Sequence, residues 1–265
     1  MHVRIPAFDF SNSPAIWAPA NPGFAHKYDG ASLLLPYLEP YLIRVMRQAQ
    51  QTLADQGRCS PALAEQVRIF NQQEGQHYQL HSAYNDYLKQ HYDGLDAFEE
   101  EIKADFERML AEESLQWNLA YSVGFETIGP IQTPLWFDTA ASEREGADPM
   151  VDALWSWHLA EEFEHRCVAF DLYQQLYGSW RERLKLFFYQ NRHLEQFTDR
   201  VAIHMLRQDA AAGRLELQPS IEQSQAFRRR FERHARPKVL AVLMPWHNPA
   251  RAKIPAQAAT VLANT

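Results

Sequence analysis

Three side chains that bind metals recur along one stretch of the sequence, His158-Leu-Ala-Glu-Glu-Phe-Glu-His165. His158, Glu162 and His165 stand at positions i, i+4 and i+7, so in a helix they project from the same side over about two turns. Imidazole nitrogens and carboxylate oxygens along one helical edge predict a metal site.

A second stretch repeats this spacing. Glu74 and His77 stand at i and i+3, and His81 follows one turn later. Glu-x-x-His on each of two helices, with one Glu from each of two other helices, is the arrangement that binds two irons inside a four-helix bundle. The pattern therefore predicts two further carboxylates on two further helices.

Two acidic residues in apolar surroundings meet this requirement. Glu39 lies in a segment rich in Leu and Tyr, and Glu126 is the one acidic residue between Leu119 and Leu135. Each also has an ordinary explanation, since an acid in a first helical turn complements the helix dipole and one at a helix end can bond free amides. The predicted metal ligands are Glu39, Glu74, His77, Glu126, His158, Glu162 and His165.

Four further polar residues lie beside the predicted ligands. Glu161 has nearly the same helical position as Glu162 and could replace it, although the match to the second stretch favours Glu162. His81 is either an extra ligand or a hydrogen-bond partner of one. Asp171 and Asn85, one or two turns beyond a ligand, either orient an imidazole or lie on a helix surface.

Two divalent cations would neutralise the four predicted carboxylates, whose burial without metal would be very costly. Mixed nitrogen and oxygen donors fit iron or manganese better than magnesium, calcium or a structural zinc; we predict two iron ions, with manganese or zinc as alternatives. Cys59 and Cys167 are the only cysteines and lie far apart, which excludes Cys-based zinc sites and iron–sulfur clusters and predicts a reducing compartment. Electrons for a redox reaction must then come from a separate cofactor or a separate donor protein, and we predict an electron donor protein.

Apolar periodicity predicts the helices that position these residues. Capping signals at Ser60-Pro61 and Asp148-Pro149 mark two helix starts, and two prolines inside the first helix should bend it or move its start later. Gly75, within a helix, predicts the close approach of a neighbouring helix or a substrate. The expected helices span about 30–55, 61–91, 96–128, 149–178 and 179–212, followed by a sixth helix from Pro219 to about 235 and a short segment closed by Pro245.

The predicted fold is all-α, a ferritin-like four-helix bundle with additional C-terminal helices. Residues 1–30 are expected to form an extended arm that packs Phe8, Phe10 and Trp17 on the body. Residues 31–246 are expected to form the helical di-metal domain, and 247–265 a flexible tail.

Composition limits the partners. The net charge of −7 is spread along the chain, so no nucleic-acid partner is expected, and no leader segment or apolar run of membrane-spanning length is seen, which predicts a cytoplasmic protein without a membrane partner. The basic run at 228–230 is a solvated helix face or a docking site for an acidic electron-transfer protein.

An apolar face is expected on the helix over 179–212. Its residues Leu184, Phe187 and Phe188 either form a homodimer contact or cover the metal site.

Three motifs give the chain a resemblance to the bacterial family of predicted metal-dependent hydrolases of ferritin-like type. They are Leu-Leu-Pro-Tyr-Leu-Glu39, Gln73-Glu74-x-x-His77-x-x-x-His81 and Trp157-His158-x-x-Glu161-Glu162-x-Glu164-His165. The last motif is also similar to that of the di-iron arylamine N-oxygenases, in which an extra His gives one iron a second imidazole. On that template the same seven residues would be the ligands.

The leading functional hypothesis is a non-haem di-iron oxidase or oxygenase that activates O2 to oxidise a small organic substrate. Its predicted partners are O2, that substrate and the electron donor. One alternative is a dinuclear hydrolase using a metal-activated water, and another is a non-enzymatic metal-binding bundle. The expected walls of an apolar substrate cavity are Trp117, Tyr121, Phe125, Trp155 and Phe163.

Overall fold

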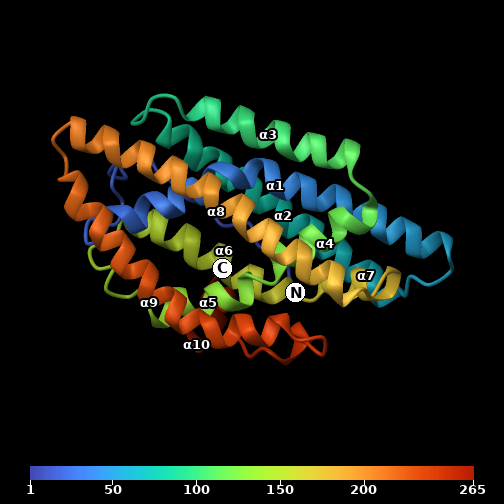
Figure 1. The fold of residues 1–265 in the computed structure, drawn as a ribbon. Coiled ribbons are helices and arrows are strands. Elements are labelled where there is room, and N and C mark those ends of the chain that lie inside the picture. The colour runs from blue at the N-terminus through green and yellow to red at the C-terminus, as the bar shows by residue number, and fades with distance from the viewer.

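The computed structural model describes residues 1–265 and contains ten α-helices, one short 3-10 helix and no strands, which confirms the all-α prediction (Figure 1). The helices are α1 (Pro22–Asp55), α2 (Pro61–Leu88), α3 (Leu95–Glu112), α4 (Leu115–Glu126), α5 (Gly129–Asp138), α6 (Pro149–His165), α7 (Val168–Leu176), α8 (Trp180–Ala211), α9 (Leu217–Leu243), the 3-10 helix (Pro249–Arg251) and α10 (Ala256–Asn264).

The long helices α1, α2 and α8 form the frame of the bundle. Helix α1 packs along α2 on one side and α8 on another, and α3 and α4 also contact it. Helix α6 lies against α2 and is covered by α5 and α10. One continuous apolar core joins these elements, so the side chains at the centre of the bundle are removed from water.

The N-terminal arm packs on this core as expected, with Phe10 and Trp17 buried. However, the arm is shorter than predicted, because α1 begins at Pro22 rather than near Gly30. The Asn21 side chain accepts a hydrogen bond from the Phe24 amide, and Pro22 occupies the first helical position. A capping residue followed by proline is a strong helix start, and it lies before the apolar stripe on which the prediction rested.

Pro36 and Pro40 lie inside α1 without ending it. Pro36 has no N–H to donate to the carbonyl of Ser32, four residues earlier. That carbonyl instead accepts a hydrogen bond of 2.9 Å from Asn85 Nδ2 on α2. The side-chain bond replaces the missing helical one, and α1 continues through Glu39.

Two predicted helices are each divided in the structure. The helix expected from residue 96 breaks at Glu113–Ser114, where the Ser114 hydroxyl caps the start of α4. The helix expected over 149–178 breaks at Arg166–Cys167, directly after the last predicted ligand, His165. The apolar pattern continues across both breaks, so periodicity alone could not reveal them.

The C-terminal part also differs from the prediction. Helix α9 is a single helix with Pro219 in its first turn and Pro237 in its interior, rather than a helix ending at about 235 and a separate segment. Helix α2 ends at Leu88, short of residue 91. The stretch expected to fray contains α10, which packs on α6, and the carbonyl of Leu262 accepts a hydrogen bond of 2.9 Å from Arg4 Nε. The two termini therefore lie side by side (Figure 1).

No helix has the length and apolar character needed to cross a membrane.

Candidate metal centre

The structure brings all seven predicted ligands together at the centre of the bundle. Four helices contribute: α1 supplies Glu39, α2 supplies Glu74 and His77, α4 ends at Glu126, and α6 carries the remaining three. None of the seven is more than 2% exposed. The ligand-bearing faces predicted from helical spacing therefore point toward one another.

The donor atoms lie at separations suited to shared metal ions. Glu74, His77, Glu162 and His165 form one group, and Glu39, His77 and His158 form a second, each with its donor atoms within 4.8 Å of one another. Two ligands of one metal lie at most about 4.2 Å apart, since each bond is roughly 2.1 Å long. Observed pairs fall in this range, such as His165 Nε2 to Glu74 Oε1 at 3.0 Å and His77 Nδ1 to Glu162 Oε1 at 3.8 Å.

Glu126 lies beside the first group, with Oε2 2.9 Å from His165 Nδ1. Its other carboxylate oxygen has no hydrogen-bond partner.

Unpartnered polar atoms give an independent test of whether these residues fit metal ions. Each of the seven carries at least one buried oxygen or nitrogen without a hydrogen-bond partner, and both oxygens of Glu39 and of Glu74 are unpartnered. Buried polar atoms are normally paired, because an unpaired one costs about 1–3 kcal/mol or more. Divalent cations would satisfy all of these atoms at once, so the donor set fits two metal ions.

The titration of the site also reflects its crowding. Burial, together with the neighbouring carboxylates, raises the pKa of Glu39 and of Glu162 well above the ordinary value. Burial lowers the pKa of His158 well below its usual value. Burial opposes charge at His77 too, but the hydrogen bond to Glu161 and the nearby carboxylate of Glu74 outweigh burial and raise the pKa of His77 to about 9. Without metal ions, protons bound to the carboxylates and imidazoles must therefore supply the positive charge that the site needs.

The structure separates the roles of the adjacent acids Glu161 and Glu162. Glu162 faces the cluster, whereas Glu161 Oε2 lies 3.2 Å from His77 Nε2. Glu161 Oε1 accepts a hydrogen bond of 2.9 Å from Arg4 Nη1 of the N-terminal arm. A carboxylate that accepts from His77 Nε2–H leaves the lone pair on Nδ1, and Nδ1 is the unpartnered atom that faces the cluster.

Glu161→Gln and Arg4→Ala are both expected to weaken metal binding, by about 10–100-fold for Glu161→Gln and by less for Arg4→Ala. Each change loosens the orientation of the His77 ring without removing a ligand. Competition of bound metal with a chelator measures the effect. Glu65→Gln and Arg68→Ala alter an exposed ion pair of the same kind on α2 and should leave the affinity unchanged. Equal affinities in all four variants would contradict this role.

His81 belongs to a buried chain of hydrogen bonds rather than to either group of donor atoms. Asn85 Nδ2 donates to the Ser32 carbonyl, so Asn85 Oδ1 accepts from Ser32 Oγ at 2.7 Å. Ser32 Oγ must then accept from His81 Nδ1, 2.8 Å away. His81 is thus a neutral imidazole with its lone pair on Nε2, and its ring contacts that of His158 at 4.9 Å between centroids.

Of the other two polar candidates, Asn85 fixes the His81 ring through Ser32. Asp171 is only half-buried and forms no hydrogen bond with a site residue, so it lies on the surface side of α7.

Gly129 allows α5 to pass close to Glu162. A Cβ on Gly129 would lie 3.0 Å from the Glu162 Cβ and 3.2 Å from its carbonyl oxygen. The Gly129-Pro130 break thus positions α5 directly over a ligand. The close approach predicted at Gly75 is not found, because a Cβ there would meet nothing within 4 Å.

Gly129→Ala is therefore expected to shift Glu162 by a few tenths of an ångström and to weaken metal binding several-fold. Gly75→Ala is the matched control, since it adds the same methyl group to a helix in open space. It should leave metal affinity unchanged and stabilise α2 by up to about 1 kcal/mol. Chelator competition and thermal unfolding of both variants measure these effects, and a Gly129→Ala protein with wild-type affinity would show that the contact is unimportant.

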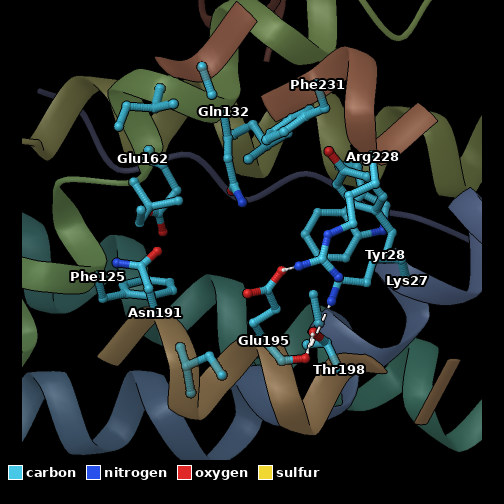
Figure 2. Close-up of a pocket in the computed structure, with 18 of the residues that line it drawn as sticks. Lys27, Tyr28, Phe125, Gln132, Glu162, Asn191, Glu195, Thr198, Arg228 and Phe231 are labelled. Carbon is cyan, nitrogen blue, oxygen red and sulfur yellow. Dashed lines mark hydrogen bonds and ion pairs between the residues drawn. The ribbon is translucent and has the colours of Figure 1, made fainter. Parts of the chain in front are cut away.

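A cavity of about 350 Å³ opens beside the metal-ligand cluster and is bordered by two of the predicted ligands, His158 and Glu162. Figure 2 shows Glu162 at this cavity. Two of the predicted wall residues, Phe125 and Trp155, line it. The other three, Trp117, Tyr121 and Phe163, do not; they pack in or against the core instead. Much of the remaining wall comes from α8 and α9. The α8 residues that line it are not Leu184, Phe187 or Phe188, which the sequence suggested as a possible cover of the site.

Residues 2–253 of the chain match the family described as predicted metal-dependent hydrolase. The chain belongs to this family. No curated protein and no solved structure matches the chain. The family's description, together with the buried His and Glu cluster, supports a metal-dependent enzyme and favours the hydrolase alternative over the oxygenase.

Neither the role of Arg4 nor the contribution of α9 to the cavity could be predicted from the sequence. Arg4 lies more than 150 positions from Glu161, and no spacing rule links an extended arm to a helix at that distance. The basic run on α9 was expected to be a solvated helix face or a docking site. In the structure Arg228, which is half exposed, also borders the cavity and forms ion pairs with Glu195 and Glu232.

Proposed function

We propose that the protein is a metal-dependent hydrolase that uses two divalent metal ions bound by the seven carboxylate and imidazole side chains between α1, α2, α4 and α6. The observation that carries this proposal is the set of buried donor atoms that lack any hydrogen-bond partner and lie beside an open cavity. The family's description supports hydrolysis as the reaction class.

When bound, two divalent ions would lower the pKa of a water molecule so that hydroxide is available near neutral pH. The chain's own residues have three tasks. Glu161 and Arg4 hold the His77 ring in one tautomer. His158 and Glu162 line the cavity, so a substrate in the cavity lies next to the metal site. The apolar side chains of the cavity wall limit the access of bulk water to the reacting bond.

A second candidate is the oxidation of an organic substrate by O2 at a di-iron site. The arrangement of the donors favours it: Glu-x-x-His occurs on both α2 and α6, with single carboxylates on α1 and α4. This candidate needs an electron donor protein and iron specifically, whereas hydrolysis needs neither.

The two candidates are distinguished by loading the metal-free protein with zinc, manganese or iron and measuring turnover of carboxylic esters and amides with and without O2. Hydrolysis is expected to proceed anaerobically with redox-inert zinc, and to disappear in Glu162→Gln but not in the exposed-site control Glu107→Gln. Activity that appears only with iron, and that consumes O2 together with reductant, would replace hydrolysis by the oxidase candidate.

A further inference from the structure

The wall of the cavity changes character from the metal centre to the mouth. Near His158 and Glu162 it combines apolar side chains such as Leu34 and Phe125 with neutral amides, and 15 of its 28 lining residues are hydrophobic. Its other charged residues come from α1, α8 and α9. Figure 2 shows three of them, Lys27, Glu195 and Arg228, on the opposite side of the cavity from Glu162. A molecule that reaches the metals must therefore be desolvated and must pack against apolar side chains.

The charged groups at the mouth are already paired. Lys27 Nζ lies 2.5 Å from Asp199 Oδ1, and Arg228 lies 2.5 Å from Glu195 and 2.9 Å from Glu232. Two cations thus face three carboxylates, so no cation is free to bind an anionic ligand. Phosphate recognition normally uses unpaired Arg or Lys side chains or a helix N-terminus. At the mouth, neither Lys27 nor Arg228 is free for that purpose.

The polar groups deeper in the cavity are neutral amides. Gln132 projects into the space between Glu162 and Arg228 (Figure 2). Gln190 is 2% exposed, and its side-chain Oε1 accepts a hydrogen bond of 3.2 Å from Asn191 Nδ2. The side-chain nitrogen Nε2 of Gln190 donates to no protein atom. Amide donors and acceptors in an apolar wall can bind a carbonyl group without requiring charge.

We propose that the cavity accepts an uncharged carboxylic ester or amide bearing one aromatic or aliphatic group, and not a phosphoester. An ionised group in the apolar part of the cavity would lose its hydration without gaining a partner. A volume of about 350 Å³ is at the lower end for ligand cavities, so the substrate is small.

The reaction itself rests on the function proposed above. In it the oxygen of water bonds to the acyl carbon, the C–O or C–N bond breaks, and a proton passes to the leaving oxygen or nitrogen. No oxidant or reductant is consumed.

Recognition is tested by calorimetric titration of the metal-loaded protein with three probes of similar size: 4-phenylbutanamide, 3-phenylpropane-1-sulfonate and 4-phenylbutylammonium. The neutral amide is expected to bind at least tenfold more tightly than either ion. Ala31→Phe, which fills the cavity from α1, should weaken amide binding at least tenfold without loss of metal. Ala62→Phe on the exposed side of α2 is the matched control and should bind normally.

If Ala31→Phe does not fold, Ala235→Phe fills the cavity from α9 instead. An ion that binds as tightly as the amide, or amide binding unaffected by a folded cavity-filling variant, would overturn the proposal.

Turnover is tested separately with 4-nitrophenyl butyrate and 4-nitrophenyl phosphate. Faster turnover of the phosphate would overturn the substrate class. Selective amide binding with no hydrolysis of either ester would support the recognition inferred here and count against hydrolysis as the function, so the two failures are distinguishable.

Discussion

Glu162→Ala is expected to lower the bound metal from about two ions per chain to one or none and to weaken binding of the remaining ion more than about 100-fold. Residues that only orient a ligand already contribute about 10–100-fold to metal affinity, and Glu162 is placed to contact the metals directly. Its Oε1 lies within 4 Å of nitrogens on His77, His158 and His165, so it is placed to share a metal ion with each of these imidazoles. Glu126→Ala should have an effect of the same kind.

Stability measurements separate this effect from general damage to the fold. In the metal-free protein, Glu162 is one of several crowded carboxylates whose pKa values burial raises, so its removal should stabilise that form. In the metal-loaded protein the same change should destabilise. Glu107→Ala, on the exposed face of α3, should alter neither form. Wild-type metal content in both Glu162→Ala and Glu126→Ala would contradict the ligand assignment.

Removal of the metals is expected to make the free energy of unfolding fall as pH rises from 7 to 9. His77 has a pKa of about 9 in the folded protein and His165 one well above its ordinary value, because nearby carboxylates outweigh the effect of burial at both. In this interval the folded chain holds protons that the unfolded chain has released, so unfolding becomes more favourable as pH increases. The loss should be roughly 2 kcal/mol or more over the two pH units.

The pH interval is chosen to exclude groups that act in the opposite direction. Burial lowers the pKa of His81 and of His158, which makes the unfolded chain the better proton acceptor, but only below about pH 6.5. Glu74, with a pKa of about 2 because His165 and His77 outweigh its burial, is ionised in both states above pH 6. Raised carboxylate pKa values at Glu39 and Glu162 act in the same direction as the two histidines.

The metal-loaded protein should behave differently, since metal ions displace these protons and bind more tightly as pH rises. Its stability should stay level or increase between pH 7 and 9. Urea unfolding at pH 7, 8 and 9, with and without prior chelation, measures both slopes. Parallel slopes in the two forms would mean that the cluster does not exchange protons for metal.

The metal centre could be predicted from the sequence because its donors obey local geometry. Helical spacing alone aligned His158, Glu162 and His165, and isolated acids in apolar segments identified Glu39 and Glu126. The distinction between Glu161 and Glu162 could not be made in this way. Both lie on the inward side of α6, and their roles are separated by His77 and by Arg4 from a distant part of the chain.

Helix boundaries were less predictable for a physical reason. The break after His165 has no Gly or Pro to mark it and is a property of the packed structure. Ser114 did provide a capping signal, but the apolar stripe continues on both sides of it. The cavity was only partly foreseen, since α9 and α8 form much of its wall and their placement depends on tertiary contacts.

The most direct test of the two-metal centre is elemental analysis of the purified, metal-saturated protein by mass spectrometry, normalised to chain concentration. About two divalent ions per chain are predicted, since four carboxylates from four helices require that much positive charge to remain buried and ionised. A saturating content of one ion, or of none, would contradict the dinuclear centre and with it the proposed hydrolysis.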